Sequence, residues 1–233
     1  MRNGAFQTDG RSGPIGHRSA CPLSKDFLVH LTNITYTAIN GAFYSRTQRK
    51  PTMLNRNQIA QAQQRTTDML AAANIQLTPV EQQHIEIADF GLGELERTGL
   101  QIVVYINNER YCAKELVMFS RQTCPQHRHP PLSATNPGKM ETFRCRQGMV
   151  WLYVEGAAEA NPKAHIPQGG EPHYTVFHEI ELNPGEQYTI PPDTWHWFQS
   201  GDEGAIVSEF SSASYDEYDI FIDPRIRRIA EIT

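Results

Sequence analysis

The chain has 233 residues, of which 39% are hydrophobic and 20% charged, as is typical of a globular protein with one substantial core. It contains no apolar run long enough for a membrane span, and its net charge of -5 argues against nucleic acid as the main partner. Four cysteines without a Cys-x-x-Cys pair are too few for a disulfide scaffold of this size, so a reducing compartment, the cytoplasm, is expected.

Residues 1–52 differ from the rest of the chain in charge and pattern. They carry seven basic residues against two acidic ones, a net charge of +5, which leaves -10 for the remainder. No apolar period is sustained here, whereas the pattern becomes regular directly after Met53. We expect an N-terminal extension, either disordered and lineage-specific or the product of a start codon placed too early, with a transit peptide as the alternative.

Residues 53–99 predict a helical segment that packs on the remainder of the chain. Asn55 to Asn74 consists of good helix formers with an apolar stripe, which indicates a helix. Thr78-Pro-Val-Glu81 combines an N-cap, a proline at the first helical position and a capping glutamate, so a second short helix should begin there. Two glycines make residues 89–93 a loop.

From residue 100 to the end, short β-rich runs separated by turn residues predict a sandwich or barrel with a C-terminal tail. A stretch rich in Gly, Pro and Ala, residues 156–172, should be an excursion from one edge. The expected strands are residues 100–106, 111–119, 142–145, 149–154, 174–182, 187–190, 195–199 and 205–210.

The sequence Cys124-Pro-Gln-His127-Arg-His129 places two imidazoles two positions apart. In an extended strand such residues point to the same face, and the same rule aligns Lys139 with Glu141. A third strand carrying His196 would complete three imidazoles and one carboxylate, a set that suits Mn, Fe or Zn. His-x-His is also common on solvated strands, so the pair alone is weak support.

Strand alternation from His127 places Cys124 on the opposite face of its strand. Thiolate ligands would favour Zn over Mn. We therefore expect Cys124 and Cys145 to be buried and inert rather than metal ligands.

Longer motifs around these residues resemble the cupin superfamily. Glu141 is followed by six residues and then Gly148, and Gly185 and Pro191 lead at fixed distance to His196. The chain departs from the pattern where eleven residues separate His129 from Glu141, so residues 130–138 should form a loop over the barrel mouth. Other departures are Arg121 in place of a glycine, and Asp193 and Ser200 in place of Gly and Asn.

Within that superfamily the chain resembles the D-lyxose ketol-isomerases from about residue 54 to residue 229. The resemblance implies a mostly β fold, a cupin double-stranded β-helix jelly-roll barrel with N-terminal helices. Five linked motifs carry it: Cys124 to Pro130, Gly138 to Cys145, Pro184 to Pro192, His196 to Gln199, and Ser208 to Ser211.

The resemblance also implies an activity, a metal-dependent aldose–ketose isomerase that interconverts D-lyxose and D-xylulose, and D-mannose and D-fructose. A divalent metal, Mn in the first place with Zn, Co or Fe as alternatives, would stabilise charge on the sugar oxygens. Its ligands would be His127, His129, Glu141 and His196. The expected partners are a sugar substrate and a second copy of the chain in a homodimer, without nucleic acid or membrane.

Three further residues are candidates for proton transfer. Lys139 shares a face with Glu141 and would donate to O1 or O2 of the sugar, although a surface lysine is the alternative. Glu209 lies where the family has an acid, and would be the base at C1 and C2, or else a salt-bridged structural carboxylate. Asp219 belongs to an acidic cluster of the kind that is more often a solvated face or a cap.

Two other functions compete with the isomerase. A cupin dioxygenase or oxidase uses the same ligands but has no need of an inward Lys139 and Glu209, and oxygen uptake would distinguish it. A non-catalytic sugar-binding cupin usually lacks a full ligand set, which this chain has.

Overall fold

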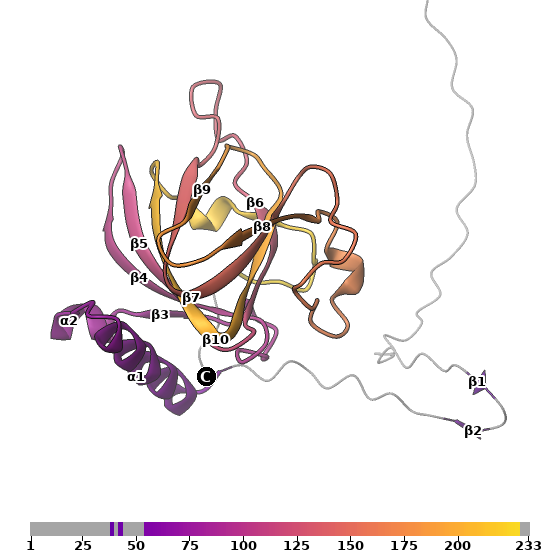
Figure 1. Cartoon of the computed structure of the whole chain (residues 1–233), viewed down its shortest axis with the longest axis horizontal. Helices are drawn as coiled ribbons and strands as arrows, with labels where there is room; N and C mark the ends of the chain where they lie inside the picture. The colour runs from indigo at the N-terminus through magenta and orange to yellow at the C-terminus, as the bar shows by residue number, and fades with distance from the viewer. Residues whose placement is uncertain (1–37, 40–41, 44–53, 229–233) are drawn as a thin grey trace, which may run out of the picture. The chain divides into compact units, whose positions relative to one another are not determined.

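The computed structural model describes residues 38–39, 42–43 and 54–228. The chain divides into two units, Met1–Gln48 and Arg49–Thr233. The described part of the first unit is one antiparallel pair, β1 (Ala38–Ile39) with β2 (Ala42–Phe43) (Figure 1). The expected extension, residues 1–52, otherwise lies outside the described residues, and its boundary and nature stay a prediction.

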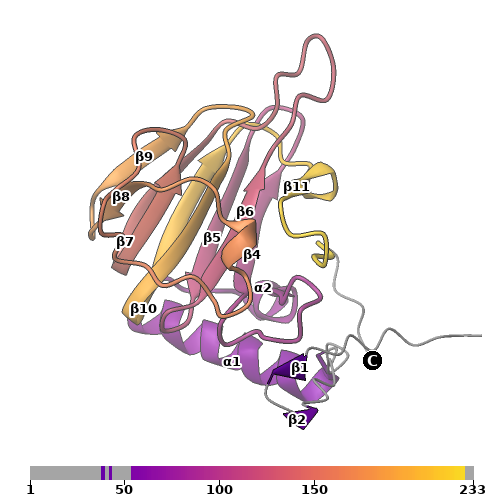
Figure 2. The same ribbon diagram turned by 90° about the vertical axis from the view of Figure 1, so that its right-hand side faces the viewer.

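Both expected helices of the second unit are confirmed, with their caps. Helix α1 (Arg56–Ala72) begins after Asn55, and α2 (Pro79–Gln83) begins after Thr78; each start is a capping box that satisfies backbone N–H groups. In α1 the side chains of Ala62 and Leu70 are buried. They belong to an apolar cluster with strand residues such as Val117, which fixes the helix against the sheet (Figure 2).

Nine antiparallel strands form one curled sheet in the order β11-β6-β10-β5-β4-β3, with β7 pairing with β10, β8 and β9. The mostly β, cupin-like fold is thereby confirmed, while β3 was not foreseen from the sequence. The strands are β3 (Glu86–Ala88), β4 (Leu100–Asn107), β5 (Cys112–Met118), β6 (Thr123–Arg128), β7 (Glu141–Val154), β8 (His178–Leu182), β9 (Gln187–Ile190), β10 (His196–Ser211) and β11 (Ile220–Phe221).

Strands β7 and β10 are double-length, and each joins two of the expected strands. Along their ladder Glu141 is opposite Ser211, and His196 is opposite Val154, so Glu141 and His196 mark opposite ends. Their side chains nevertheless lie 3.1 Å apart. The ladder therefore folds back on itself, and its two halves become facing walls of the barrel.

The corner of this fold is a pair of glycines. Gly148 has φ +71° and Gly204 φ +75°, values that L side chains rarely adopt. A Cβ on Gly148 would lie 2.0 Å from the Gly204 carbonyl oxygen, so the two backbones can approach only because no side chain intervenes. The register of the ladder shifts at the same place, between Ser200 and Ala205.

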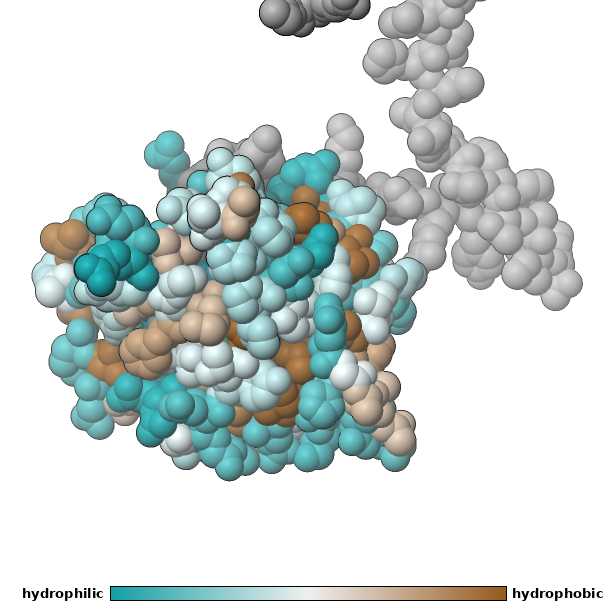
Figure 3. All heavy atoms as spheres, turned by 90° about the horizontal axis from the view of Figure 1, so that it is seen from above, coloured by the Kyte–Doolittle hydropathy of each residue, from teal (hydrophilic) through white to brown (hydrophobic). Residues whose placement is uncertain are grey.

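The barrel interior is apolar over most of its length, with buried residues such as Leu116, Phe143, Leu152 and Phe198. The expected excursion packs on the outside of the barrel. There Ala164 and Tyr174, which directly follows the 3₁₀ turn η1 (Glu171–His173), belong to a buried aromatic cluster. Seen from above, hydrophilic and hydrophobic residues alternate over the surface (Figure 3). None of the described helices is long and apolar enough to cross a membrane.

Candidate metal centre

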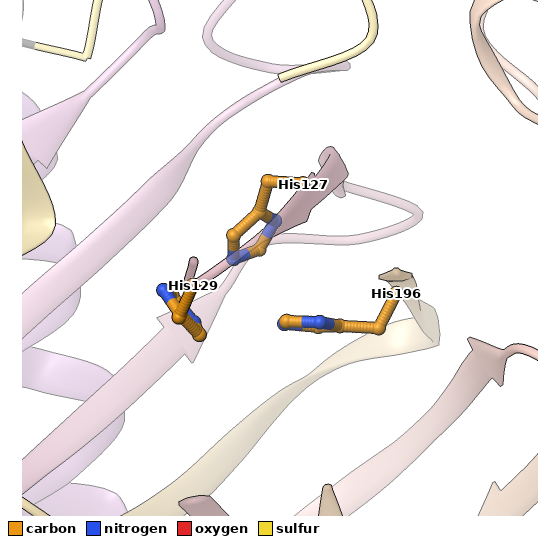
Figure 4. A group of neighbouring side chains, drawn as sticks. All are labelled: His127, His129 and His196. Atoms are coloured by element: carbon orange, nitrogen blue, oxygen red, sulfur yellow. The ribbon is translucent and has the colours of Figure 1, made fainter. Parts of the chain in front are cut away.

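Three histidines converge at one end of the barrel, from two neighbouring strands. His127 lies near the end of β6 and His129 directly follows this strand, while His196 begins β10 directly opposite His127. One ring nitrogen of each lies within 4.8 Å of the others, and all three side chains are buried. Figure 4 shows the rings turned toward a common centre. This is the spacing that three imidazole ligands of one cation require.

The other nitrogen of each ring is held by an oxygen. Nδ1 of His127 donates to the Pro125 carbonyl at 2.9 Å, and Nδ1 of His196 donates to the Thr194 carbonyl at 2.9 Å. Nδ1 of His129 donates to Oδ1 of Asp219 at 2.5 Å. Because carbonyl and carboxylate oxygens accept, each Nδ1 carries a proton, which leaves Nε2 of each ring as the nitrogen that can bind a cation at the centre.

Glu141, at the start of β7, supplies a carboxylate to the same centre. Its Oε1 lies 3.1 Å from Nε2 of His129 and 3.1 Å from Nε2 of His196. Burial would raise the pKa of Glu141, but the positive charge of Lys139 and of His129 holds it well below its usual range. The carboxylate is therefore ionised inside the barrel.

A divalent cation fits this donor set. Within the described part of the chain, Nε2 of His196 is fully buried yet has no hydrogen-bond partner. A buried polar atom without a partner costs free energy unless something else satisfies it. Three nitrogen lone pairs and one anionic oxygen that meet at one point are the ligands that Mn, Fe, Co and Zn accept.

The protonation of the histidines differs from one ring to the next. Burial lowers the pKa of His127 well below its ordinary value, with the neighbouring His196 and His129 acting in the same direction. For His129, burial and Lys139 lower the pKa, but Glu141 and Asp219 outweigh them and raise it to about 9. Because a ligand nitrogen must be free of its proton, metal binding to His129 would release one.

Beside the centre lies a buried ion pair. Nζ of Lys139 is 2.7 Å from Oε2 of Glu141 and 3.0 Å from Oε1 of Glu209. Burial would lower the pKa of Lys139, but these two carboxylates hold it well above its ordinary range. The hydroxyl of Ser211 also donates to Oε1 of Glu209, at 3.1 Å, so Oε2 of Glu209 is left without a protein partner in this part of the chain.

These groups line a cavity of about 40 Å³, room for about three waters. Its floor is apolar, with Leu116, Phe143 and Phe198, and its polar wall contains Lys139, Glu141 and Glu209. A smaller recess, bordered by Leu132, Tyr215 and Tyr218, shares His129, Lys139 and Asp219 with the cavity. The connection over residues 130–138 projects beyond the barrel end (Figure 2) and contributes Pro130, Leu132 and Asn136 to this recess.

The expectation for Cys124 is wrong in orientation. Cys124 lines the same cavity as His127, because β6 contains a bulge: His127 and Cys124, three apart, face His196 and Phe198, which are two apart. One extra residue reverses the parity of a strand. The thiol is nevertheless inert as expected, since burial raises its pKa well above the ordinary value.

The structure thus brings together every residue predicted for the site, including Asp219, which contacts a histidine through its side chain. It also adds residues that sequence reasoning missed. Lys114, Asp216 and Arg228 also line the cavity. Strand alternation along β5 could have marked Lys114 as an inward cation among apolar residues, but its partners follow about a hundred positions later in the chain.

The fold and the site define a cupin-like barrel with a buried candidate metal centre. A sequence profile described as D-lyxose isomerase matches residues 66–233. The chain belongs to the D-lyxose isomerase family, and the expectation of an isomerase enzyme is confirmed.

Two relatives and one solved structure illustrate the likeness. The D-lyxose/D-mannose isomerase of Thermosediminibacter oceani is 63% identical over 180 residues, which cover 77% of this chain and 99% of the relative. The D-lyxose ketol-isomerase of a Thermofilum species is 59% identical with the same coverage. The L-ribose isomerase of Acinetobacter sp. DL28, solved with L-ribose, superposes with a TM-score of 0.67 over 79% of this chain and 100% of its own. At 14% identity, that last likeness shows the fold alone.

Proposed function

We propose that the protein interconverts D-lyxose and D-xylulose, and D-mannose and D-fructose, with a divalent metal held by His127, His129, Glu141 and His196. One observation carries this proposal: the three buried imidazoles and the carboxylate meet beside a cavity that is also lined by the Lys139–Glu209 pair. The names of relatives at about 60% identity support the choice of sugars.

The bound metal would supply Lewis acidity toward two adjacent sugar oxygens. Glu209 takes the proton from C2 of the aldose with its unpartnered Oε2 and returns it to C1, which converts the aldose to the ketose through an enediol. The Lys139 ammonium stabilises the negative charge that develops on the substrate oxygen: it donates a proton to O1 and takes one back from O2, so that it is charged again at the end of the reaction. Apolar residues on the floor of the cavity exclude water from the carbanionic carbon.

For Asp219 we propose a role other than the catalytic one expected. Its carboxylate accepts from Nδ1 of His129, so it orients a ligand and strengthens its basicity. We therefore assign it as a positioning residue for the metal centre.

We favour Mn because the proposed ligands are nitrogen and carboxylate, without thiolate. The cytoplasm is supported by three free, buried cysteines, Cys112, Cys124 and Cys145. A homodimer is supported by exposed aromatic residues on the outer face of β4 and β10, Tyr105 and Phe210, which are 42% and 51% exposed.

The test is to reconstitute the full chain with Mn²⁺ and supply a panel of aldopentoses and aldohexoses, following ketose formation. We expect turnover of D-lyxose and D-mannose, and none after the metal is removed by a chelator. Oxygen uptake with a substrate, in place of ketose, would identify a dioxygenase or oxidase. Sugar binding without any conversion would identify a non-catalytic binding protein.

A further inference from the structure

A second buried ion pair lies in the same cavity, next to the acid–base pair. Lys114 on β5 is opposite Glu209 in the ladder with β10, and it is 4% exposed. Its ammonium reaches Oγ of Ser214 at 2.9 Å and the two carboxylate oxygens of Asp216 at 2.8 and 3.1 Å. Three acceptors satisfy all three N–H groups of an ammonium, so Lys114 has no donor left for a substrate.

Asp216 is held from a second side as well. Arg228 donates to its Oδ2 at 3.0 Å, and also binds Glu86 on β3. Burial would raise the pKa of Asp216, but Lys114, Lys139 and Arg228 lower it far below its usual range. Both members of the Lys114–Asp216 pair are therefore charged, and the loss of either leaves an uncompensated charge inside the protein.

Asp216 begins the segment that crosses the metal site. It opens the 3₁₀ turn η2 (Asp216–Tyr218), and its carbonyl accepts from the backbone N–H of Asp219 at 3.3 Å. The chain then enters β11, which pairs with β6, and Phe221 stacks on His127 at 5.3 Å between ring centroids. One short segment thus carries the side-chain partner of His129 and the cover of His127.

The three histidines depend on this segment to different degrees. His127 and His196 each donate to a carbonyl two residues earlier in the chain, so their orientation is fixed locally. His129 donates to a side chain 90 positions later. Its orientation therefore depends on where the segment containing η2 is held.

We propose that Lys114 is a positioning residue for the metal centre: by anchoring Asp216, it holds Asp219 against His129 and so sets the affinity of the site for a divalent cation. The inference rests on the metal centre assigned under the proposed function, but not on the sugar. It predicts that a residue outside the ligand set controls metal affinity without contacting metal or substrate.

The test measures Mn²⁺ affinity in the absence of sugar, by competition with a chromogenic chelator. Lys114→Met keeps the length of the side chain and removes its charge, and we expect about 10-fold to 100-fold weaker Mn²⁺ binding. Lys163→Met is the matched control, since Lys163 is a surface lysine 55% exposed that also bridges two carboxylates, and its affinity should equal that of the wild type.

A double-mutant cycle identifies the route of the effect. If Lys114 acts through Asp219, then Lys114→Met should add less than twofold to the loss already caused by Asp219→Asn. Amide hydrogen exchange of the metal-free protein gives a second readout, with faster exchange expected at residues 219–222 in Lys114→Met and unchanged exchange in α1.

Two results would overturn the proposal: Lys114→Met binding Mn²⁺ within twofold of the wild type, or losses that add fully with those of Asp219→Asn. If Lys114→Met does not fold, Asp216→Asn breaks the same anchor from the other side and carries the same expectations. A wild type that binds Mn²⁺ yet isomerises no sugar would remove the proposed function and leave this inference standing.

Discussion

At the scale of single residues, Glu141 links the histidine cluster to the Lys139–Glu209 ion pair, which would otherwise be separate. Its Oε1 faces two of the imidazoles, while its Oε2 accepts from Lys139, which in turn binds Glu209. One carboxylate thus belongs both to the proposed ligand set and to the proton-transfer pair. Its substitution should affect the metal first, because the charge on Oε1 is what makes the site anionic.

We predict that Glu141→Gln loses most of its metal. The amide is neutral, so the attraction for a dication falls, while Lys139 loses one of its two partners. Metal content after dialysis against dilute Mn²⁺, measured by plasma mass spectrometry, checks this, and circular dichroism controls for the fold. A variant with full metal content and full activity would contradict the ligand assignment.

Glu209→Gln should separate chemistry from binding. The variant keeps all four proposed ligands and therefore its metal, but lacks the base, so kcat should fall by about 10²-fold to 10⁴-fold. Glu203→Gln, an exposed glutamate on the same strand β10, is the matched control and should be unaffected. Activity within a few-fold of the wild type would point to another base or to a hydride shift.

At the scale of elements, sequence reasoning succeeded where the signal is local. The capping box at the start of α1 and the one at the start of α2 each span only four residues. The helix starts at Asn55 and Thr78 could therefore be predicted. It failed where partners are distant. The bulge in β6 depends on the register with β10, and no local pattern marks it, so alternation assigned Cys124 to the wrong face.

The anchored segment predicts a specific pH dependence of stability. Because Lys114 and its neighbours depress the folded-state pKa of Asp216 below its ordinary value of 3.8, its ion pair stabilises the protein above that pH and is lost as the pH falls. The wild type should therefore exceed Asp216→Asn in urea midpoint at pH 7, and the gap should begin to narrow below about pH 4, where the unfolded chain takes up a proton that the folded Asp216 does not.

A control for this measurement lies on the surface. Asp202 pairs with Arg121 but is 75% exposed, so Asp202→Asn should change the urea midpoint little at any pH. A gap for Asp216→Asn that stays constant from pH 7 to pH 3 would mean that its ionisation is not linked to folding.

At the scale of the whole molecule, the family motifs predicted the barrel and the proposed ligands because they are specific in combination. What no motif contained was the network around Lys114: its partners Ser214 and Asp216, and the Arg228 that donates to Asp216, come from the far end of the chain. Such networks are defined by tertiary contacts. A single sequence without alignment does not reveal them.

Removing residues 1–52 should leave both fold and activity intact. The proposed site, both helices and the whole nine-stranded sheet lie between Leu54 and Arg228, and each strand has its partner within that range. Expression from Met53, followed by comparison of melting temperature and kcat/KM with the full chain, checks this. An insoluble or inactive product would show that the N-terminal residues stabilise the barrel.

The glycine corner of the β7–β10 ladder sets the angle between two arms whose far ends carry Glu141 and His196. Seven residues of extended chain span about 23 Å, so a tilt of about 5° at the corner would move the far end by about 2 Å. Cation coordination tolerates errors of about 0.2 Å. Gly148 and Gly204, at the opposite end of the barrel from the ligands, therefore set the distance between Glu141 and His196.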